Sequence, residues 1–242
     1  MKLSPPLADT LRYLADLGWD AIYPVPPGAP PAAPPDAPPG PAPAPPECAL
    51  APAGDAARLA ALAVEAAGCT RCRLASTRRK VVFGSGDPAA RLMVVGEGPG
   101  AEEDRQGLPF VGPAGELLTK ILAAIGLGRD QVYIANIVKC RPPGNREPQA
   151  DEVAACRDYL EGQIAAIRPA VLVCFGRVAA QVLLGTDSPI GRMRGQWHSV
   201  RGVPTMVTYH PAALLRNAEY KRPTWEDMQK VRDRLLEGAA GR

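Results

Sequence analysis

The sequence predicts an α/β fold, a three-layer sandwich around a central, mainly parallel four-stranded sheet. Short apolar runs typical of buried strands alternate with helical segments four times along the chain. Glycine and polar residues follow the end of each such run, as they do at the ligand-binding edge of an open α/β sheet. Apolar residues make up 46% of the chain, which is enough to bury a core.

The first 52 residues are expected to lie outside this fold. Leucines at helical spacing predict a short amphipathic helix within residues 1–23. Residues 24–52 hold 14 of the 28 prolines and are expected to form a semi-rigid linker. Residues 53–242 then form the folded domain. The amino-terminal segment either packs on its own domain, or is merely a variable tail, or binds a protein partner.

Beyond the linker, the periodicity of apolar residues assigns each element in turn. Buried strands are expected at 91–97, 131–138, 170–176 and 203–210. The segment 196–200 is a candidate antiparallel partner of the last strand, across an Arg-Gly turn. Helices are expected at 56–68, 112–126, 148–167, 177–185 and 223–238.

Composition excludes several classes of protein. No apolar run approaches the roughly 20 residues that a membrane-spanning helix needs, and the amino terminus lacks the pattern of a secretory signal. We therefore expect a cytoplasmic protein, and a monomer. The net charge of +3 neither demands nor excludes a nucleic-acid partner. In this setting the six cysteines indicate a metal or redox site rather than a disulfide framework.

Functional groups gather where the predicted strands end. The loop 96–100, with sequence GEGPG, follows the first strand, and Asn136 closes the second. Arg177 follows the third strand and His210 the fourth. The loop lacks the third glycine of a dinucleotide-binding motif and no GK[ST] follows it, which argues against a nucleotide cofactor. Because the carboxyl ends of parallel strands meet at one edge, we expect these groups to share a site.

Four motifs in this order resemble the family 4 uracil-DNA glycosylases, the iron–sulfur branch of the uracil-DNA glycosylase superfamily. They are GEGPGAEED (96–104), GLPFVGPAGELL (107–118), ANIVKCRPPGNR (135–146) and HPAALLR (210–216). The resemblance runs from about Cys69 to the end of the last helix. It implies a uracil-DNA glycosylase-like fold and a monofunctional hydrolase of base excision repair. Such an enzyme flips uracil out of DNA, hydrolyses its N-glycosidic bond and leaves an abasic site.

The resemblance also implies how uracil is bound. Phe110 would stack on the flipped base, unless it is only a core residue. Asn136 would pair with O4 and N3 of uracil and reject cytosine, whose pattern is reversed, although capping of the next turn is the alternative. His210 would donate a hydrogen bond to O2, where negative charge develops as uracil leaves. The residues implied to bind uracil are Gly96, Glu97, Gly98, Phe110, Asn136 and His210.

The water-activating group is less clearly marked. The best-known branch of the superfamily has an aspartate where this chain has Gly98, a small residue that family 4 shares. We therefore assign Glu97, together with His210, to catalysis, and expect Glu97 to orient the water with help from loop carbonyls. Glu103 is a candidate for excluding thymine by crowding the C5 position, or it is part of the acidic first turn of a helix.

The cysteines fit the same resemblance. The ligands it implies for a [4Fe–4S] cluster are Cys69, Cys72, Cys140 and Cys156. Spacing alone leaves zinc open, because zinc also takes four thiolates. Cys48 lies in the linker and Cys174 in a predicted strand, so neither is expected to be a ligand.

Basic residues favour uracil-containing DNA as the partner. One run holds five of them without an acid, and six more flank the predicted site, although a solvated basic face gives the same pattern. The residues assigned to DNA binding are Arg146, Leu214 and Arg216, with Leu215 a further candidate for filling the gap left by the base. The basic residues of the run are Arg71, Arg73, Arg78, Arg79 and Lys80; those that flank the site are Lys139, Arg141, Arg146, Arg216, Lys221 and Arg222.

Two other functions compete with hydrolysis. One is a non-turnover protein of the same superfamily that binds or cross-links uracil-DNA. Relatives that cross-link carry an inserted basic loop with a histidine, whereas this chain reads RPPGNREP at 141–148. The other is a CxxC redox protein, which the glycosylase motifs between the two pairs of cysteines argue against. Strand cleavage is not expected, because no lysine is placed like a Schiff-base nucleophile.

Overall fold

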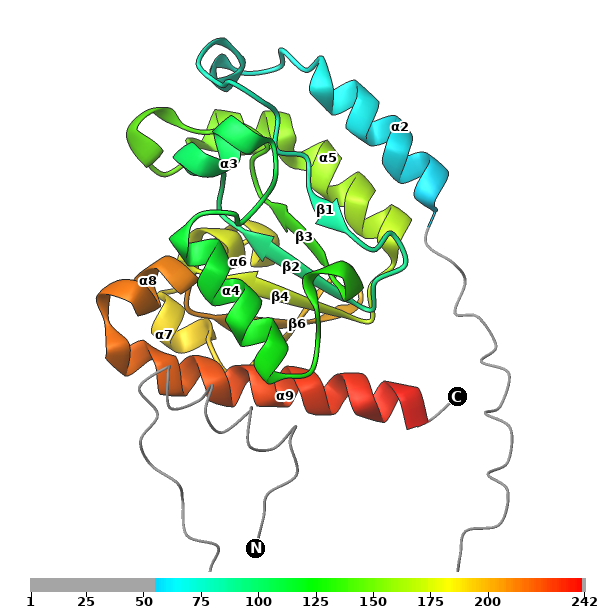
Figure 1. Cartoon of the computed structure of the whole chain (residues 1–242), viewed down its shortest axis with the longest axis vertical. Helices are drawn as coiled ribbons and strands as arrows, with labels where there is room; N and C mark the ends of the chain where they lie inside the picture. Colours follow the sequence, from blue (N-terminus) through cyan, green and yellow to red (C-terminus); the bar gives the residue numbers. More distant parts are fainter. Residues whose placement is uncertain (1–54, 241–242) are drawn as a thin grey trace, which may run out of the picture. The chain divides into compact units, whose positions relative to one another are not determined.

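The structure, a computed structural model, describes residues 55–240, with side chains described from 55 to 237 (Figure 1). The predicted helix within 1–23 and the linker 24–52 lie outside the described residues. Within the described part, no helix combines the length and the apolar character needed to cross a bilayer.

The centre of the fold is a six-stranded sheet in the order β1-β3-β2-β4-β6-β5. The four predicted strands are confirmed as its parallel part, and they are β2 (Leu92–Gly96), β3 (Tyr133–Asn136), β4 (Val171–Phe175) and β6 (Val203–Thr208). Each lies within two residues of its predicted bounds at either end. The sheet also has two antiparallel edge strands, so the expected number of strands was too low.

Of the two edge strands, one was predicted from the sequence and the other was not. The strand β5 (Trp197–Val200) pairs with β6 through a turn at Arg201 and Gly202, as predicted. Both turn residues have positive φ, 52° and 81°, which is the backbone of a tight two-residue hairpin. The strand β1 (Ser85–Gly86) pairs with β3 over only two residues, too few to leave any alternation in the sequence.

Helices cover both faces of the sheet, which confirms the three-layer architecture (Figure 1). The predicted helices are present, each within two residues of its expected bounds: α2 (Ala56–Ala67), α4 (Pro113–Ala124), α5 (Ala150–Ile167), α6 (Arg177–Leu184) and α9 (Lys221–Ala240). Short elements fill the connections: α3 (Ala101–Gln106), α7 (Ile190–Met193), α8 (Pro211–Arg216) and the 3-10 turns η1 (Arg73–Ser76), η2 (Arg129–Gln131), η3 (Pro143–Asn145) and η4 (Ala218–Tyr220).

The core divides between the two faces of the sheet because successive strand residues point to opposite sides. On one face, Met93 and Val95 of β2 belong to a cluster with Leu160 and Ile164 of α5. The helix α2 packs on α5, and α6 contacts β2 and β4 on this side. On the other, α9 contacts β4 and β6 and buries Met228 completely. The carboxyl ends of the parallel strands are left open at one edge.

Candidate active site and cysteine cluster

A cavity of about 400 Å³ opens where β2 and β3 end. Gly96 and Asn136 are register partners at the last positions of these two parallel strands. The cavity brings together five of the six residues predicted to bind uracil: Glu97, Gly98, Phe110, Asn136 and His210. The sixth, Gly96, lies directly behind two of them. The sequence prediction that the strand ends share one site is therefore confirmed for the ends of β2, β3 and β6.

Gly96 has no room for a side chain. A Cβ atom at this position would lie 2.5 Å from Oδ1 of Asn136 and 2.5 Å from Cζ of Phe110. Both distances are below van der Waals contact, so the amide and the ring lie against the bare backbone of β2. The glycine thus permits the two side chains to come together over the strand end.

Asn136 presents an unsatisfied acceptor to this cavity. The residue is 2% exposed, and its Oδ1 atom has no hydrogen-bond partner in the part of the chain that the structure describes. Leaving a buried polar group unpaired costs about 1–3 kcal/mol. An N–H group supplied by a ligand in the cavity would satisfy this oxygen.

Phe110 is held in a left-handed backbone conformation, with φ of 53°. Its ring stacks on the His210 ring, with 5.6 Å between centroids and 29° between planes. The turn after it is fixed by Glu103, whose Oε1 atom accepts hydrogen bonds from the amides of Val111 and Gly112, both at 2.9 Å. The other carboxylate oxygen accepts from the Gly100 amide at 3.1 Å. Glu103 thus joins the loop after β2 to the turn that carries Phe110.

His210 is held neutral, with its proton on Nε2. Its Nδ1 atom accepts a hydrogen bond from the Ala212 amide at 3.1 Å, so the ring caps the amino terminus of α8. Burial, assisted by the positive charge of Arg216, lowers the pKa of His210 to about 4. A neutral ring with Nδ1 occupied as an acceptor carries an N–H donor on its other nitrogen. His198, by contrast, lies on β5 and contacts the Met193 carbonyl, outside the cavity.

Glu97 lies among charged groups at the rim of the cavity. Burial raises its pKa above the usual 4.5, the negative charge of Glu147 raises it further, and Arg177 opposes both effects. Arg177, at the end of β4, is ion-paired with Glu147. Glu147 has no predicted role in the sequence, because it lies in a connection and has no motif of its own.

The predicted DNA-binding residues have different surroundings. Arg216 is exposed and lines the cavity. Arg146 also lines it, but its guanidinium binds both oxygens of the buried Glu152 carboxylate, at 2.6 and 2.8 Å. Leu214 is only 3% exposed, so its assignment to DNA contact was wrong; it lies on the inner face of α8. The exposed leucine of this helix is Leu215, at 55%.

The predicted basic surface also needs correction. Acids distant in sequence neutralise part of it: Arg71 pairs with Glu65 and Asp158, and Arg73 pairs with Asp151. Lys139, predicted to flank the site, is buried instead, at 1% exposed. A count of charges along the chain cannot reveal such pairs, because they form only when α2, η1 and α5 come together.

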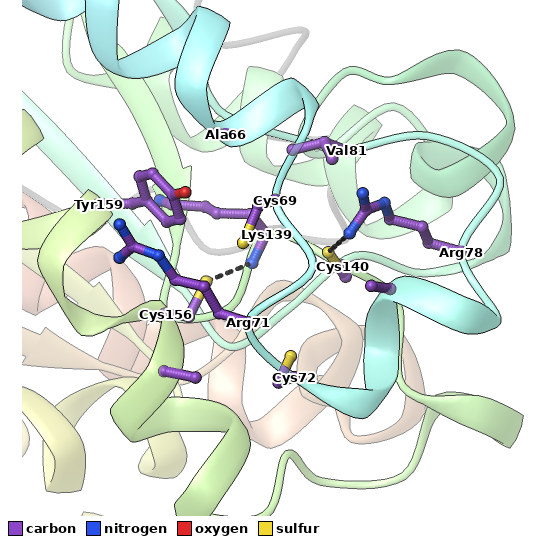
Figure 2. A pocket seen from close by; sticks show the side chains of 12 residues that line it. Ala66, Cys69, Arg71, Cys72, Arg78, Val81, Lys139, Cys140, Cys156 and Tyr159 are labelled. Carbon is purple, nitrogen blue, oxygen red and sulfur yellow. Dashed lines mark hydrogen bonds between the residues drawn. The ribbon is translucent and has the colours of Figure 1, made fainter.

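Four thiols line one pocket on the α2 and α5 side of the fold (Figure 2). Cys69 and Cys72 follow α2, Cys140 follows β3, and Cys156 lies on α5. Within the range 55–237, no three His, Cys, Asp or Glu side chains converge closely enough to hold a single metal ion. Cys174 is buried in β4, apart from this pocket, as predicted.

The pocket offers hydrogen bonds to two of the sulfur atoms. The Lys139 amide donates to Sγ of Cys156 at 3.3 Å, and the Arg78 guanidinium donates to Sγ of Cys140 at 3.4 Å (Figure 2). Burial raises the pKa of the Cys140 thiol to about 11, although the Arg78 guanidinium opposes this effect. Four cysteines in one pocket, two of them with donors to their sulfur atoms, fit a group larger than one ion that takes four thiolates.

Comparison with known proteins agrees with this geometry. The family model described as the uracil DNA glycosylase superfamily matches residues 83–229. A type-4 uracil-DNA glycosylase of Archaeoglobus fulgidus is 43% identical over 175 residues, covering 69% of this chain and 88% of that protein. Its counterpart from Thermotoga maritima is 45% identical, covering 68% and 88%. The protein of that name from Sulfurisphaera tokodaii is 43% identical, covering 70% and 81%. The chain therefore belongs to the type-4 uracil-DNA glycosylases of the uracil-DNA glycosylase superfamily.

Proposed function

We propose that this protein hydrolyses the N-glycosidic bond of uracil in DNA, as the names of its relatives indicate for them. One observation carries the proposal: an unpaired amide acceptor on Asn136, an N–H donor on His210 and the ring of Phe110 meet in one cavity. At about 400 Å³, the cavity lies within the usual size range of small-ligand sites.

Recognition of the base rests on Phe110 and Asn136. A uracil flipped out of the stack lies on the aromatic ring, a contact that contributes about 1–3 kcal/mol per base. The Asn136 carbonyl accepts from N3–H and its amino group donates to O4. Cytosine has an acceptor at N3 and a donor at N4, so it would leave buried groups unpaired, and such mismatches are rejected strongly.

Cleavage follows a dissociative course. The bond between C1′ and N1 breaks with its electron pair leaving on uracil, whose O2 accepts a hydrogen bond from Nε2 of His210. A donor of this kind stabilises charge that develops only in the transition state. The ionised Glu97 carboxylate orients a water, whose oxygen bonds to C1′. The proton of that water passes to solvent, the uracil anion takes a proton from solvent, and uracil and an abasic deoxyribose remain.

Glu103 is proposed to exclude thymine. Its carboxylate lines the cavity and is held by three backbone amides. A side chain fixed in this way cannot swing aside for the C5 methyl group, so it acts as a rigid wall.

The exposed part of α8 is proposed to meet the DNA. Arg216 and Arg146 would contact phosphates, and Leu215 rather than Leu214 would occupy the gap left by the flipped base. Arg146 would contact DNA while still bound to Glu152, and so contributes less charge than Arg216. Phosphate contacts predict binding that weakens steeply as salt rises.

Cys69, Cys72, Cys140 and Cys156 are proposed to hold a [4Fe–4S] cluster. When bound, the cluster supplies a covalent cross-link between the segment after α2, the loop after β3, and α5. A zinc ion would require four sulfurs about 2.3 Å from one point, whereas a cluster spreads its ligands over a larger group.

Base release decides between the proposed function and its rivals. The purified protein is incubated with three single-stranded DNAs that differ only in carrying uracil, cytosine or thymine at one position. We expect free uracil and an abasic strand from the first DNA alone, and a large loss of that activity in Asn136→Ala. A covalent adduct without free uracil would indicate the cross-linking function, and no reaction would overturn both. Thymine release by Glu103→Ala would support the role of Glu103.

A further inference from the structure

Lys139 is a buried cation with no carboxylate partner among the residues the structure describes, and the acidic group that acts on it is the Cys156 thiol. It is 1% exposed, and its ammonium donates to the backbone carbonyl of Asn136 at 2.8 Å and to Oε1 of Gln163 at 2.5 Å. Taking an ammonium group out of water costs several kcal/mol. An apolar side chain of similar length would fill the same space without this cost. The contacts of the ammonium must therefore offset the cost of burying the charge.

One side of the ammonium is fixed by a second buried polar residue. Gln163 of α5 is fully buried, and its Nε2 atom donates to the Phe83 carbonyl at 2.8 Å and to the Tyr133 hydroxyl at 3.3 Å. Its own amide orientation is therefore set by the chain around it. Gln163 accepts a hydrogen bond from Nζ of Lys139 and does not line the cavity.

The backbone of Lys139 belongs to the cysteine pocket. Its amide donates to Sγ of Cys156 at 3.3 Å, and its carbonyl accepts from the Val82 amide at 2.8 Å. The residue thus lies between the pocket of thiols and the end of β3, and its side chain runs back toward Asn136.

The other side of the ammonium controls the peptide group that follows Asn136. The nitrogen of this peptide, on Ile137, donates to the Gly96 carbonyl at 2.9 Å, and its oxygen, on Asn136, accepts from Lys139. A peptide fixed at both ends sets the direction in which the Asn136 side chain leaves the backbone. Among the described residues, no hydrogen bond to Oδ1 fixes the orientation of this side chain, so its direction depends on the backbone.

We propose that Lys139 is a positioning residue for base recognition, whose buried ammonium aims the Asn136 amide by holding the Asn136 carbonyl. The inference rests on the role of Asn136 given under the proposed function. A charge-assisted bond suits this task because it is shorter and stronger than a neutral one.

Two matched variants test the inference, because both break the bond between Lys139 and Gln163 but only one breaks the bond to Asn136. Lys139→Met removes both bonds of the ammonium, whereas Gln163→Met leaves the bond to the Asn136 carbonyl. We measure kcat/KM for uracil release, thermal unfolding and visible absorbance for each. Lys139→Met is expected to lose about 10²-fold in kcat/KM, the usual effect of misplacing a group by about 1 Å. Gln163→Met is expected to lose stability but less than about 5-fold in kcat/KM, because it leaves Asn136 in place.

A double-mutant cycle shows whether Lys139 acts through Asn136. Once Asn136→Ala has removed the amide, adding Lys139→Met is expected to lower kcat/KM no further. Additive losses would overturn the inference, and so would equal losses in Lys139→Met and Gln163→Met. If Asn136→Ala alone leaves activity intact, the role of Asn136 fails first.

A further variant covers the case in which Lys139→Met does not fold. Replacing both partners of a buried polar pair with apolar groups is often nearly neutral for stability. The double variant Lys139→Met/Gln163→Met is therefore expected to fold and still show the loss of about 10²-fold, because Asn136 stays without its donor. Activity close to that of Gln163→Met in this protein would overturn the inference.

Discussion

At His210, the surroundings of the ring decide which nitrogen carries the proton. The Ala212 amide occupies Nδ1, and burial keeps the ring neutral. An imidazole in this state donates a hydrogen bond from Nε2 over the whole physiological range of pH. The charge change that makes histidine a pH switch elsewhere is moved out of that range here.

The pKa of His210 predicts a pH dependence of stability. The unfolded chain binds a proton on this ring below about pH 6.5, but the folded protein does so only near pH 4. Between these values the unfolded state holds more protons, so the free energy of unfolding falls as pH is lowered. We expect wild type to lose more stability than His210→Gln across this window in urea unfolding. Equal losses in the two proteins would show that the ring is not held neutral.

His210 should also control the rate. Removing one donor to a developing oxyanion lowers kcat by about 10²–10³-fold, and we expect this loss in His210→Ala measured by single-turnover uracil release. In wild type, the rate should show no titration centred near pH 6.5, the ordinary pKa of histidine. A step there that His210→Ala removes would contradict the neutral donor.

The raised pKa of Glu97 predicts how the rate of uracil release falls at acidic pH. Because burial and Glu147 raise its pKa above 4.5, the carboxylate that orients the water is lost at a higher pH than for an ordinary glutamate. Uracil release should therefore fall as pH drops through this raised pKa. In Glu97→Gln the rate should be low and flat over the same range. Full single-turnover activity in that variant would rule out the role of Glu97.

At the scale of elements, most of the fold could be read from the sequence because its elements repeat a simple pattern. The four parallel strands and five long helices show periodicity over several residues, so their bounds came out within two residues. The elements that escaped prediction are short, such as β1 and α7. Strand ends gave Asn136 and His210 directly. The inner face of α8 was not foreseeable, because its six residues allow either leucine to point inward.

The close packing of Asn136 and Phe110 against Gly96 gives a further prediction. Gly96→Ala places a methyl group 2.5 Å from both the Asn136 amide oxygen and the Phe110 ring, so both side chains must move. We expect a loss of about 10²-fold in uracil release, with a stability loss of about 1–3 kcal/mol for an overpacked site. Gly191→Ala is the control, because a Cβ there meets nothing within 4 Å. Unchanged kinetics in Gly96→Ala would mean that the close packing of the site is not needed.

At the scale of the molecule, the proposed cluster joins parts of the chain that the sheet does not. Cys69 and Cys72 lie on the segment before β1, whereas Cys140 and Cys156 belong to the β3–α5 connection and α5. The binding free energy of such a group is folding free energy. The monomeric state, the cytoplasmic location and a protein partner for residues 1–23 stay predictions.

Substitution of single cysteines tests whether the four thiols hold an iron–sulfur cluster. We expect the purified protein to be brown, because iron–sulfur proteins absorb at about 400 nm. Cys140→Ala should lose the colour and unfold at a lower temperature. Cys174→Ala should keep the colour, because Cys174 lies in β4 and outside the pocket. A colourless protein that contains one zinc ion would contradict the cluster.

The order of the strands has a consequence for synthesis on the ribosome. The strand β6, which directly precedes His210, is the last to emerge, and it joins the sheet by pairing with β4, which in turn pairs with β2. A nascent chain released as far as Asn136 already contains the loop 96–100 and Asn136, but neither histidine has yet been made. The proposed role of His210 therefore predicts that chains truncated before this residue release no uracil.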